Sequence, residues 1–267
     1  MKTHPDHSNL LLFNILDGEP NIAHFSTTRN GGVSRGAYES WNMGNFSDDD
    51  PVSINRNRNI LAQMFFMELE QFVIPHQTHG DKVVKIDEAF LQQDPSELID
   101  ALYGVDATVT NVKEIFLCAT TADCVPILLY DKKNKATAAI HAGWRGTVQR
   151  IVEKTVALMA IEFGSSPSDM LAAIGPAIHR ENYEVGAEVV AEFEKNGFNL
   201  AGVSSNEAGS IKIDLKEINR QELMRLGIPE TQIEKSELCT YTRDDLFFSA
   251  RRQSIHSGRM LTGIMMR

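Results

Sequence analysis

The chain has 267 residues, of which 42% are hydrophobic and 23% charged, proportions typical of a globular protein. Its formal net charge of −10 argues against nucleic acid as a partner, because phosphate backbones attract positive charge. No apolar run reaches the roughly 18 residues that a membrane-spanning helix needs, so we expect no membrane partner. The first residues, MKTHPDHSNLLLF, do not resemble a signal peptide, and we therefore expect a cytoplasmic protein.

Hydrophobic periodicity predicts many short strands and a few helices along the chain. The strands are predicted at about residues 23–28, 72–75, 82–86, 106–110, 114–119, 125–130, 136–140, 171–174, 211–213, 246–249 and 260–265. The helices are predicted near residues 52–67, 147–163, 186–196, 214–226 and 251–254.

The order of these elements indicates the fold class. Strands outnumber helices, and several strands follow one another closely, which favours mixed sheets over a regularly alternating parallel sheet. We therefore expect an α/β (α+β) layered sandwich with mixed β-sheets flanked by helices. The chain contains no repeat or linker-like tract, so we expect one domain over residues 1–267, with 1–20 as an N-terminal extension or edge strand.

Three polar segments each place a soft or borderline metal ligand at the end of a predicted strand. IPHQTHG contains His76 and His79, TTADCVPILLYD contains Cys124, and IHAGWRG contains His141. Two imidazoles and one thiolate make the three-ligand set of a catalytic zinc site with its fourth position open. Thiolate and imidazole also suit copper, so the expected cofactor is zinc, with copper as the alternative.

The choice between the two histidines of IPHQTHG rests on the backbone. We prefer His79 as the ligand, because the glycine that follows it lets the chain bend there. His76 is then a candidate substrate contact. Asp123, directly before Cys124, is a candidate catalytic proton carrier or a partner of a ligating histidine.

The same residues allow two other interpretations. The histidines could be hydrogen-bonded core or loop residues and Cys124 a buried thiol, since free cysteine is among the most buried residue types. Alternatively, Cys124 could be a nucleophile with His141 as its base. Spacing alone does not separate these interpretations from a metal site.

Glycine-rich loops with arginine are candidate anion sites. Gly143 permits a close approach of the backbone, Arg145 offers a forked donor, and the following helix directs its positive end toward the same loop. Trp144 could pack in the core or stack on a base. The loop FSTTRNGGVSRGAY contains Arg29, which we expect either to contact an anionic substrate or to be a surface charge.

The C-terminal stretch LFFSARRQSIHSGRM contains further arginines, including Arg251 and Arg259. Local basicity in an acidic chain would suit a small molecule that carries phosphate or carboxylate, although solvated surface arginines are the alternative. Tyr183, in AAIGPAIHRENYEVG, is a candidate pocket residue.

These motifs together resemble the laccase-domain family, also called multicopper polyphenol oxidoreductase-like, peptidoglycan editing factor or laccase-type purine nucleoside phosphorylase. The segments that carry the resemblance are TTRNGGVSRGAY, HQTHG, GVDATVT, TADCVPILLYD, AAIHAGWRGT, AAIGPAIHRENYEVG and FFSARRQ. They follow the family order from about residue 21 to the C-terminus. TADCVP followed by HAGWRGT is the most specific pair.

The resemblance implies that His79, Cys124 and His141 hold a metal, described as zinc and in some members as copper. It implies a layered fold similar to a bacterial deamidase-toxin domain that uses cysteine and histidine. It also implies that Arg29 and Arg145 belong to the substrate pocket. The sequence departs from the family pattern at Ala177, where cysteine is common, and in the altered segment 251–259.

The leading hypothesis is a zinc-dependent phosphorylase of adenosine, inosine, guanosine and methylthioadenosine that also deaminates adenosine, with purine nucleoside and phosphate as partners. A second hypothesis is a cysteine–histidine hydrolase or editing factor that acts on peptidoglycan precursors. A third is a non-catalytic accessory protein stabilised by zinc. Polyphenol oxidation fits poorly, because the sequence offers one three-ligand site and not the clusters of a multicopper relay.

Overall fold

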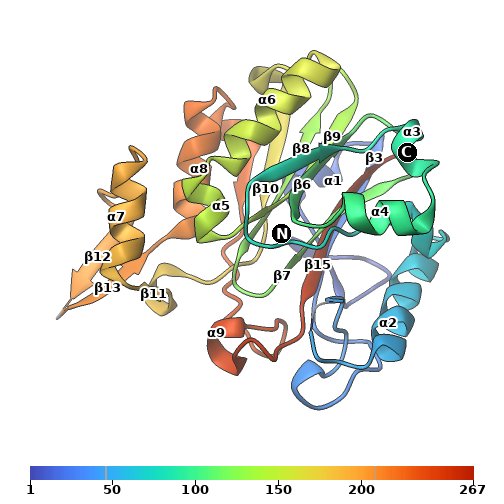
Figure 1. Cartoon of the computed structure of the whole chain (residues 1–267), viewed down its shortest axis with the longest axis horizontal. Coiled ribbons are helices and arrows are strands. Elements are labelled where there is room, and N and C mark those ends of the chain that lie inside the picture. Colours follow the sequence, from blue (N-terminus) through green and yellow to red (C-terminus); the bar gives the residue numbers. More distant parts are fainter. Residues whose placement is uncertain (46, 208) are drawn as a thin grey trace.

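The computed structural model describes residues 1–45, 47–207 and 209–267. Its centre consists of two six-stranded sheets (Figure 1). The first sheet contains, in order, β1 (Lys2–Thr3), β2 (Leu10–Leu12), β3 (Ile22–Thr27), β15 (Met260–Met266), β7 (Phe116–Thr121) and β4 (Phe72–Val73). The second contains β14 (Ile233–Lys235), β10 (Met170–Ile174), β8 (Val125–Asp131), β9 (Ala136–Ala142), β6 (Val105–Thr110) and β5 (Lys82–Lys85).

Both sheets are mixed. In the first sheet, β15 pairs antiparallel with β3 and β7, whereas β4 pairs parallel with β7. In the second sheet, β8, β9 and β6 are antiparallel neighbours, and β14 and β5 add parallel strands at the edges. The prediction of mixed sheets in an α/β fold is therefore confirmed.

The helices are α1 (Asn14–Asp17), α2 (Pro51–Met64), α3 (Glu88–Leu91), α4 (Pro95–Ala101), α5 (Trp144–Val148), α6 (Ile151–Phe163), α7 (Ala187–Lys195), α8 (Leu215–Arg225) and α9 (Ala250–Gln253). Of these, α5, α6 and α8 pack on the outer face of the second sheet and α2 on that of the first, whereas residues of α1, α3 and α4 pack with the cluster between the sheets (Figure 1). A small third sheet of β11 (Glu184–Val185), β13 (Ser210–Ile213) and β12 (Ser204–Glu207) lies beside α7. In the part of the chain that the structure describes, no helix is both long and apolar enough to span a membrane.

Alternation along the central strands explains why both faces of the second sheet are buried. In β9, Ala138 and Ile140 point to the cluster that includes α6 and α8, whereas Ala139 points to the opposite cluster. That opposite cluster also contains Leu117 of β7 and Ile264 of β15, so it fills the space between the two sheets. Residues of α2 pack on the other face of the first sheet. Buried apolar surface on every layer boundary stabilises this stack.

Two predictions of local structure are wrong. Residues 246–249 form no strand. Phe247 and Phe248 are fully buried there, but they pack in a satellite cluster without pairing in a sheet, which explains the misleading apolar run. The helix predicted at 147–163 is divided into α5 and α6, because Arg150 between them has a left-handed backbone with φ of 64°.

His24 predicts a pH dependence of stability. This β3 residue is 6% exposed, and its Nε2 accepts the backbone N–H of Phe13 at 2.9 Å. Burial lowers the pKa of His24 to about 4. The folded state therefore favours the neutral ring, and its stabilisation is present above pH 6.5 and lost as the pH falls toward 4. We expect the free energy of unfolding to fall by about 2 kcal/mol between pH 7 and pH 5 because of this histidine.

Denaturant unfolding of wild type and of His24→Gln at both pH values checks this prediction. The free energy of unfolding should fall less in the variant than in wild type. Equal decreases in the two proteins would contradict the prediction.

Candidate metal centre and its cavity

The strand register of the second sheet places the first two candidate ligands next to each other. His141 lies in β9 opposite Pro126 of β8, and Cys124 is the residue directly before that strand. Asp106 is the second residue of β6, whose neighbour Ala107 is paired with Ile140. The ends of three adjacent strands therefore bring a thiol, an imidazole and a carboxylate to one edge of the sheet.

The third candidate ligand comes from the loop between β4 and β5. His79 has a left-handed backbone with φ of 63°, which turns its ring toward the strand ends. The ring centroids of His79 and His141 are 4.9 Å apart and the rings are inclined by 80°. One ligand atom each from His79, Cys124 and His141 lie within 4.8 Å of one another. The preference for His79 over His76 in this cluster agrees with the geometry.

Asp106 holds two of these three residues. Its buried carboxylate accepts the backbone N–H groups of Thr78, His79 and Gly80 at 3.2, 3.0 and 2.9 Å. It also contacts Nδ1 of His141 at 2.7 Å. A carboxylate on one ring nitrogen fixes the orientation of a histidine and leaves Nε2 for a metal. Asp106 therefore links the loop of one ligand to the ring of another.

The charges in the cluster reinforce one another. Burial by itself raises the pKa of the Cys124 thiol, but the charge of His141 and hydrogen bonds from His141 and His79 outweigh it and lower the pKa to about 6. Burial likewise opposes protonation of His141, but Cys124 and Asp106 raise its pKa to about 9. These interactions favour the thiolate form of Cys124, which is the form that ligates metals and attacks electrophiles.

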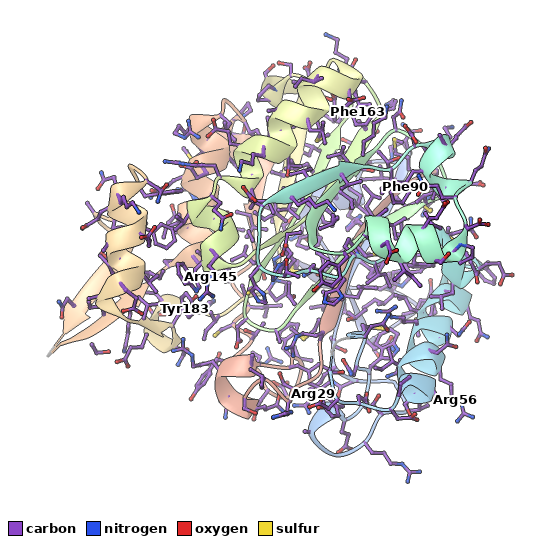
Figure 2. All side chains as sticks on the ribbon, viewed as in Figure 1. Arg29, Arg56, Phe90, Arg145, Phe163 and Tyr183 are labelled. Carbon is purple, nitrogen blue, oxygen red and sulfur yellow. The ribbon has the colours of Figure 1, made fainter. Side chains whose placement is uncertain are left out.

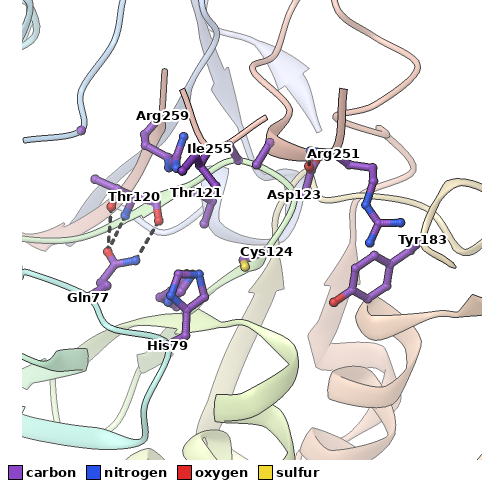
Figure 3. A pocket seen from close by; sticks show the side chains of 14 residues that line it. Gln77, His79, Thr120, Thr121, Asp123, Cys124, Tyr183, Arg251, Ile255 and Arg259 are labelled. Carbon is purple, nitrogen blue, oxygen red and sulfur yellow. Dashed lines mark hydrogen bonds between the residues drawn. The ribbon is translucent and has the colours of Figure 1, made fainter. Parts of the chain in front are cut away.

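The cluster lies in a cavity of about 500 Å³ (Figure 3). This volume is within the range of about 300–1,000 Å³ typical of small-molecule sites. The cavity is lined by Gly44, Gln77, His79, Thr120, Thr121, Ala122, Asp123, Cys124, His141, Tyr183, Ala250, Arg251, Ile255 and Arg259. Aromatic, amide and guanidinium groups thus surround the three candidate ligands.

Gly143 leaves space for the ligands. A Cβ atom at this position would lie 3.2 Å from Sγ of Cys124 and 3.2 Å from Cδ2 of His79. Its φ of −72° is ordinary for any residue, so the absence of a side chain matters and backbone freedom does not. The residue precedes α5, which begins three residues before the predicted helix start and has five residues.

Gly143→Ala is expected to displace the ligands by a few tenths of an ångström. We expect turnover to fall by about tenfold, because small misplacements at a reacting centre are costly. Gly18→Ala is the matched control, since its φ is also ordinary and nothing lies within 4 Å of the added Cβ. Metal content, turnover and melting temperature of both variants check the prediction. Identical behaviour of the two variants would show that the contact is unimportant.

Asp123 lines the cavity, but its carboxylate binds the C-terminal segment. It accepts the hydroxyl of Thr240 at 2.6 Å, the hydroxyl of Ser249 at 2.9 Å and the backbone N–H of Arg251 at 2.7 Å. These donors favour an anchoring role, in which Asp123 holds α9 against the site. The catalytic role expected from the sequence stays a prediction.

The structure does not bring every predicted substrate residue to the cavity. The guanidinium of Arg29 donates to backbone oxygens of Glu39 and Asp244 and lies 4.7 Å from the Phe248 ring, so it connects loops outside the cavity lining. His76 also lies outside the lining, with its ring 4.5 Å from that of Tyr103.

Arg145 and Trp144 lie near the cavity without lining it. Trp144 is half-buried against the core, and the guanidinium of Arg145 lies 4.3 Å from its ring. Figure 2 shows Arg145 close to the lining residue Tyr183, whereas Arg29 lies near α9. Their predicted roles as substrate contacts stay predictions.

Asp106 and Gln77 are functional residues that the motifs do not identify. Asp106 lies at the start of β6, and the β6–β9 register places it in contact with His141. Gln77 donates to the backbone oxygen of Thr120 and accepts from its N–H and hydroxyl, which fixes the ligand loop to β7. The glutamine of the HQTHG motif was the available signal for that contact.

Comparisons with known proteins identify the chain's relatives. The model of the family described as multi-copper polyphenol oxidoreductase laccase matches residues 23–267. The chain belongs to this laccase-domain family. Within it, the chain is 45% identical over 258 residues to a purine nucleoside phosphorylase of Bacteroides thetaiotaomicron, covering 96% of both proteins. It is 42% identical over 245 residues to adenosine deaminase RL5 of an unknown prokaryotic organism, covering 91% of this chain and 93% of that protein.

A solved structure of a laccase-domain relative supports the fold. The crystal structure of Bacillus licheniformis hypothetical protein YfiH superposes with a TM-score of 0.90 and 31% sequence identity, covering 99% of this chain and 98% of that one. The residues present also fit the metal that the family description implies. A thiolate and two imidazoles are ligands of both zinc and copper, and Asp106 supplies the carboxylate partner that metal-binding histidines commonly have.

Proposed function

We propose that this chain is a zinc-dependent purine nucleoside phosphorylase that also deaminates adenosine, with His79, Cys124 and His141 as the metal ligands. The observation that carries the proposal is the three-ligand cluster inside a cavity of small-molecule size. The names of the two relatives, a purine nucleoside phosphorylase and an adenosine deaminase, supply the reaction classes. Copper is the alternative metal.

The metal, when bound, would supply Lewis-acid chemistry at the floor of the cavity. The chain's own residues hold the candidate ligands in place. Asp106 fixes the ring of His141 and the backbone of the loop that carries His79, so both residues are held in place before substrate enters. Because these groups are preorganised, little reorganisation is needed during the reaction.

Two bond changes define the two reactions. In phosphorolysis, an oxygen of phosphate forms a bond to C1′ of the ribose while the bond from C1′ to the purine nitrogen breaks, and the purine leaves with the electron pair and takes up a proton. In deamination, water adds at C6 of adenine and ammonia leaves. Burial raises the pKa of Tyr183, which keeps its phenol protonated as a hydrogen-bond donor at one side of the cavity.

A second candidate function uses the same residues as a cysteine–histidine hydrolase of amide bonds, such as those of peptidoglycan precursors. The lowered pKa of Cys124 beside His141 favours it, because a thiolate next to a protonated imidazole is an activated nucleophile. Polyphenol oxidation by a multicopper relay is less well supported, since this cluster is the one potential metal site found among the described residues.

Product analysis tests the proposal. Metal-loaded protein is incubated with adenosine, with and without phosphate. We expect adenine and ribose 1-phosphate only when phosphate is present, and inosine in both cases. If metal-loaded protein forms neither adenine nor inosine, the proposed function is wrong. A covalent adduct on Cys124 formed by an amide substrate would instead support the hydrolase.

A further inference from the structure

Two arginines line the cavity, on opposite sides of the candidate metal cluster. Figure 3 shows Arg259 on the side of Gln77 and Thr120, and Arg251 with Tyr183 on the other side. Phosphorolysis brings together one anion and one flat, uncharged ring system. The two sides of the cavity therefore have to be assigned to different parts of the substrate pair.

Arg259 is held rigidly by one end of its guanidinium. Its Nη1 donates to the backbone oxygen of Ser257 at 2.6 Å, to the Ser257 hydroxyl at 2.9 Å and to the backbone oxygen of Gly258 at 2.9 Å. Its aliphatic stem lies against Gly44, where a Cβ would be 2.6 Å from Cγ of the arginine. The guanidinium is therefore positioned before any ligand binds.

The rest of this guanidinium is available to a ligand. Among the described residues, the side-chain hydrogen bonds of Arg259 all come from Nη1, which leaves Nε and Nη2 for a ligand, and no carboxylate there forms an ion pair with the group. Burial lowers the pKa of Arg259, while Cys124 and Asp123 act in the opposite direction, which indicates that the charge lies close to the cluster. A partly desolvated, preoriented guanidinium is well suited to bind the oxygens of phosphate in a forked contact.

Arg251 is engaged differently. Its Nη1 donates to the backbone oxygen of Glu184 at 2.9 Å, and its guanidinium lies 5.2 Å from the centre of the Tyr183 ring. The side chain of Arg251 is exposed to solvent, which weakens its attraction for an anion. Tyr183 adds an aromatic ring to the lining on this side, which suits stacking of a planar base.

We propose that Arg259 forms the phosphate subsite of this cavity, and that the purine binds on the side of Tyr183 and Arg251. The proposal rests on the proposed function. It agrees with the stereochemistry of displacement at C1′, because the attacking phosphate and the departing purine must lie on opposite faces of the ribose. It also replaces Arg29 and Arg145, the arginines that the sequence favoured, with one that lines the cavity.

Kinetics of Arg259→Met and Arg259→Lys test this subsite. We expect Arg259→Met to raise the KM for phosphate by at least about tenfold, since a charge-assisted forked contact is lost. Arg259→Lys should recover part of the loss, because the charge remains without the fork. Adenosine deamination needs no phosphate, so phosphorolysis should fall more than deamination in both variants. The melting temperature and the bound metal of each variant report whether the site is folded.

Arg56→Met is the matched control. Arg56 is exposed on α2 and points to solvent away from the cavity (Figure 2), so its loss should leave the KM for phosphate unchanged. An unchanged KM for phosphate in Arg259→Met would overturn the subsite. An equal loss of phosphorolysis and deamination would also overturn it, because that result indicates a structural role.

Calorimetric titration with inorganic phosphate separates this proposal from the proposed function. Wild type should bind phosphate without nucleoside, and Arg259→Met should bind it at least about tenfold more weakly. Equal binding by the two proteins would overturn the subsite. If wild type binds phosphate through Arg259 but forms no adenine, the subsite stands and the phosphorylase function is wrong.

Discussion

Replacement of Cys124 by alanine is expected to remove both bound metal and both activities. The thiolate is one of three donors within 4.8 Å of one another, and two imidazoles alone make a weak site. We expect phosphorolysis and deamination each to fall on the order of 10³-fold, about 4 kcal/mol of transition-state stabilisation. Metal analysis of the purified variant and the two product assays check this result.

Two further cysteine variants identify the reason for the loss. Cys118→Ala removes a buried thiol from the core of the first sheet, outside the cavity, and should keep metal and activity. Cys124→Asp replaces the thiolate by another metal ligand that is not a thiol nucleophile. If the cysteine acts as a ligand, Cys124→Asp retains metal and part of the activity. A metal-loaded but inactive Cys124→Asp would support the nucleophile hypothesis instead.

Asp106→Asn is expected to weaken the metal site without touching a ligand. Each carboxylate oxygen accepts two N–H donors, one from His79 and one from His141 at Oδ1, and those of Thr78 and Gly80 at Oδ2. An amide NH₂ at either position would face two donors. We expect metal affinity to fall about 10–100-fold and the free energy of unfolding to fall by about 1–3 kcal/mol.

Asp131→Asn is the control for this change. Asp131 is also fully buried and also accepts backbone N–H groups, from Lys133 and Asn134, but it lies at the far end of β8 from the cluster. It should lose a similar amount of stability and no metal affinity. Chemical denaturation and competitive metal titration of the two variants measure these quantities. Equal metal affinities in the two variants would contradict the positioning role of Asp106.

The central strands were predictable because their residues are apolar on both faces, as buried strands require. The neighbouring predictions 125–130 and 136–140 correspond to β8 and β9, whose short connection makes them a hairpin. That pairing brings Cys124 next to His141. The same apolar pattern made the prediction at 246–249 wrong. Phe247 and Phe248 are buried there, but buried apolar residues need not pair in a sheet.

The site was only partly predictable. Metal ligation by His79, Cys124 and His141 was one of several interpretations of the residues, and the family resemblance favoured it. The roles of Asp106 and Arg259 depend on contacts between segments far apart in sequence, which no local pattern encodes. Arg29 resembled an anion-binding residue because its loop is rich in glycine, yet its guanidinium is used by neighbouring backbone oxygens.

Titration of metal-free protein with zinc tests the central claim most directly. Bound metal, phosphorolysis and deamination are measured at each addition. The account predicts that both activities are absent at the start, rise together and stop rising at one zinc per chain. Full activity without metal, or a rise that continues through several equivalents, would contradict a single His79–Cys124–His141 centre that carries both reactions.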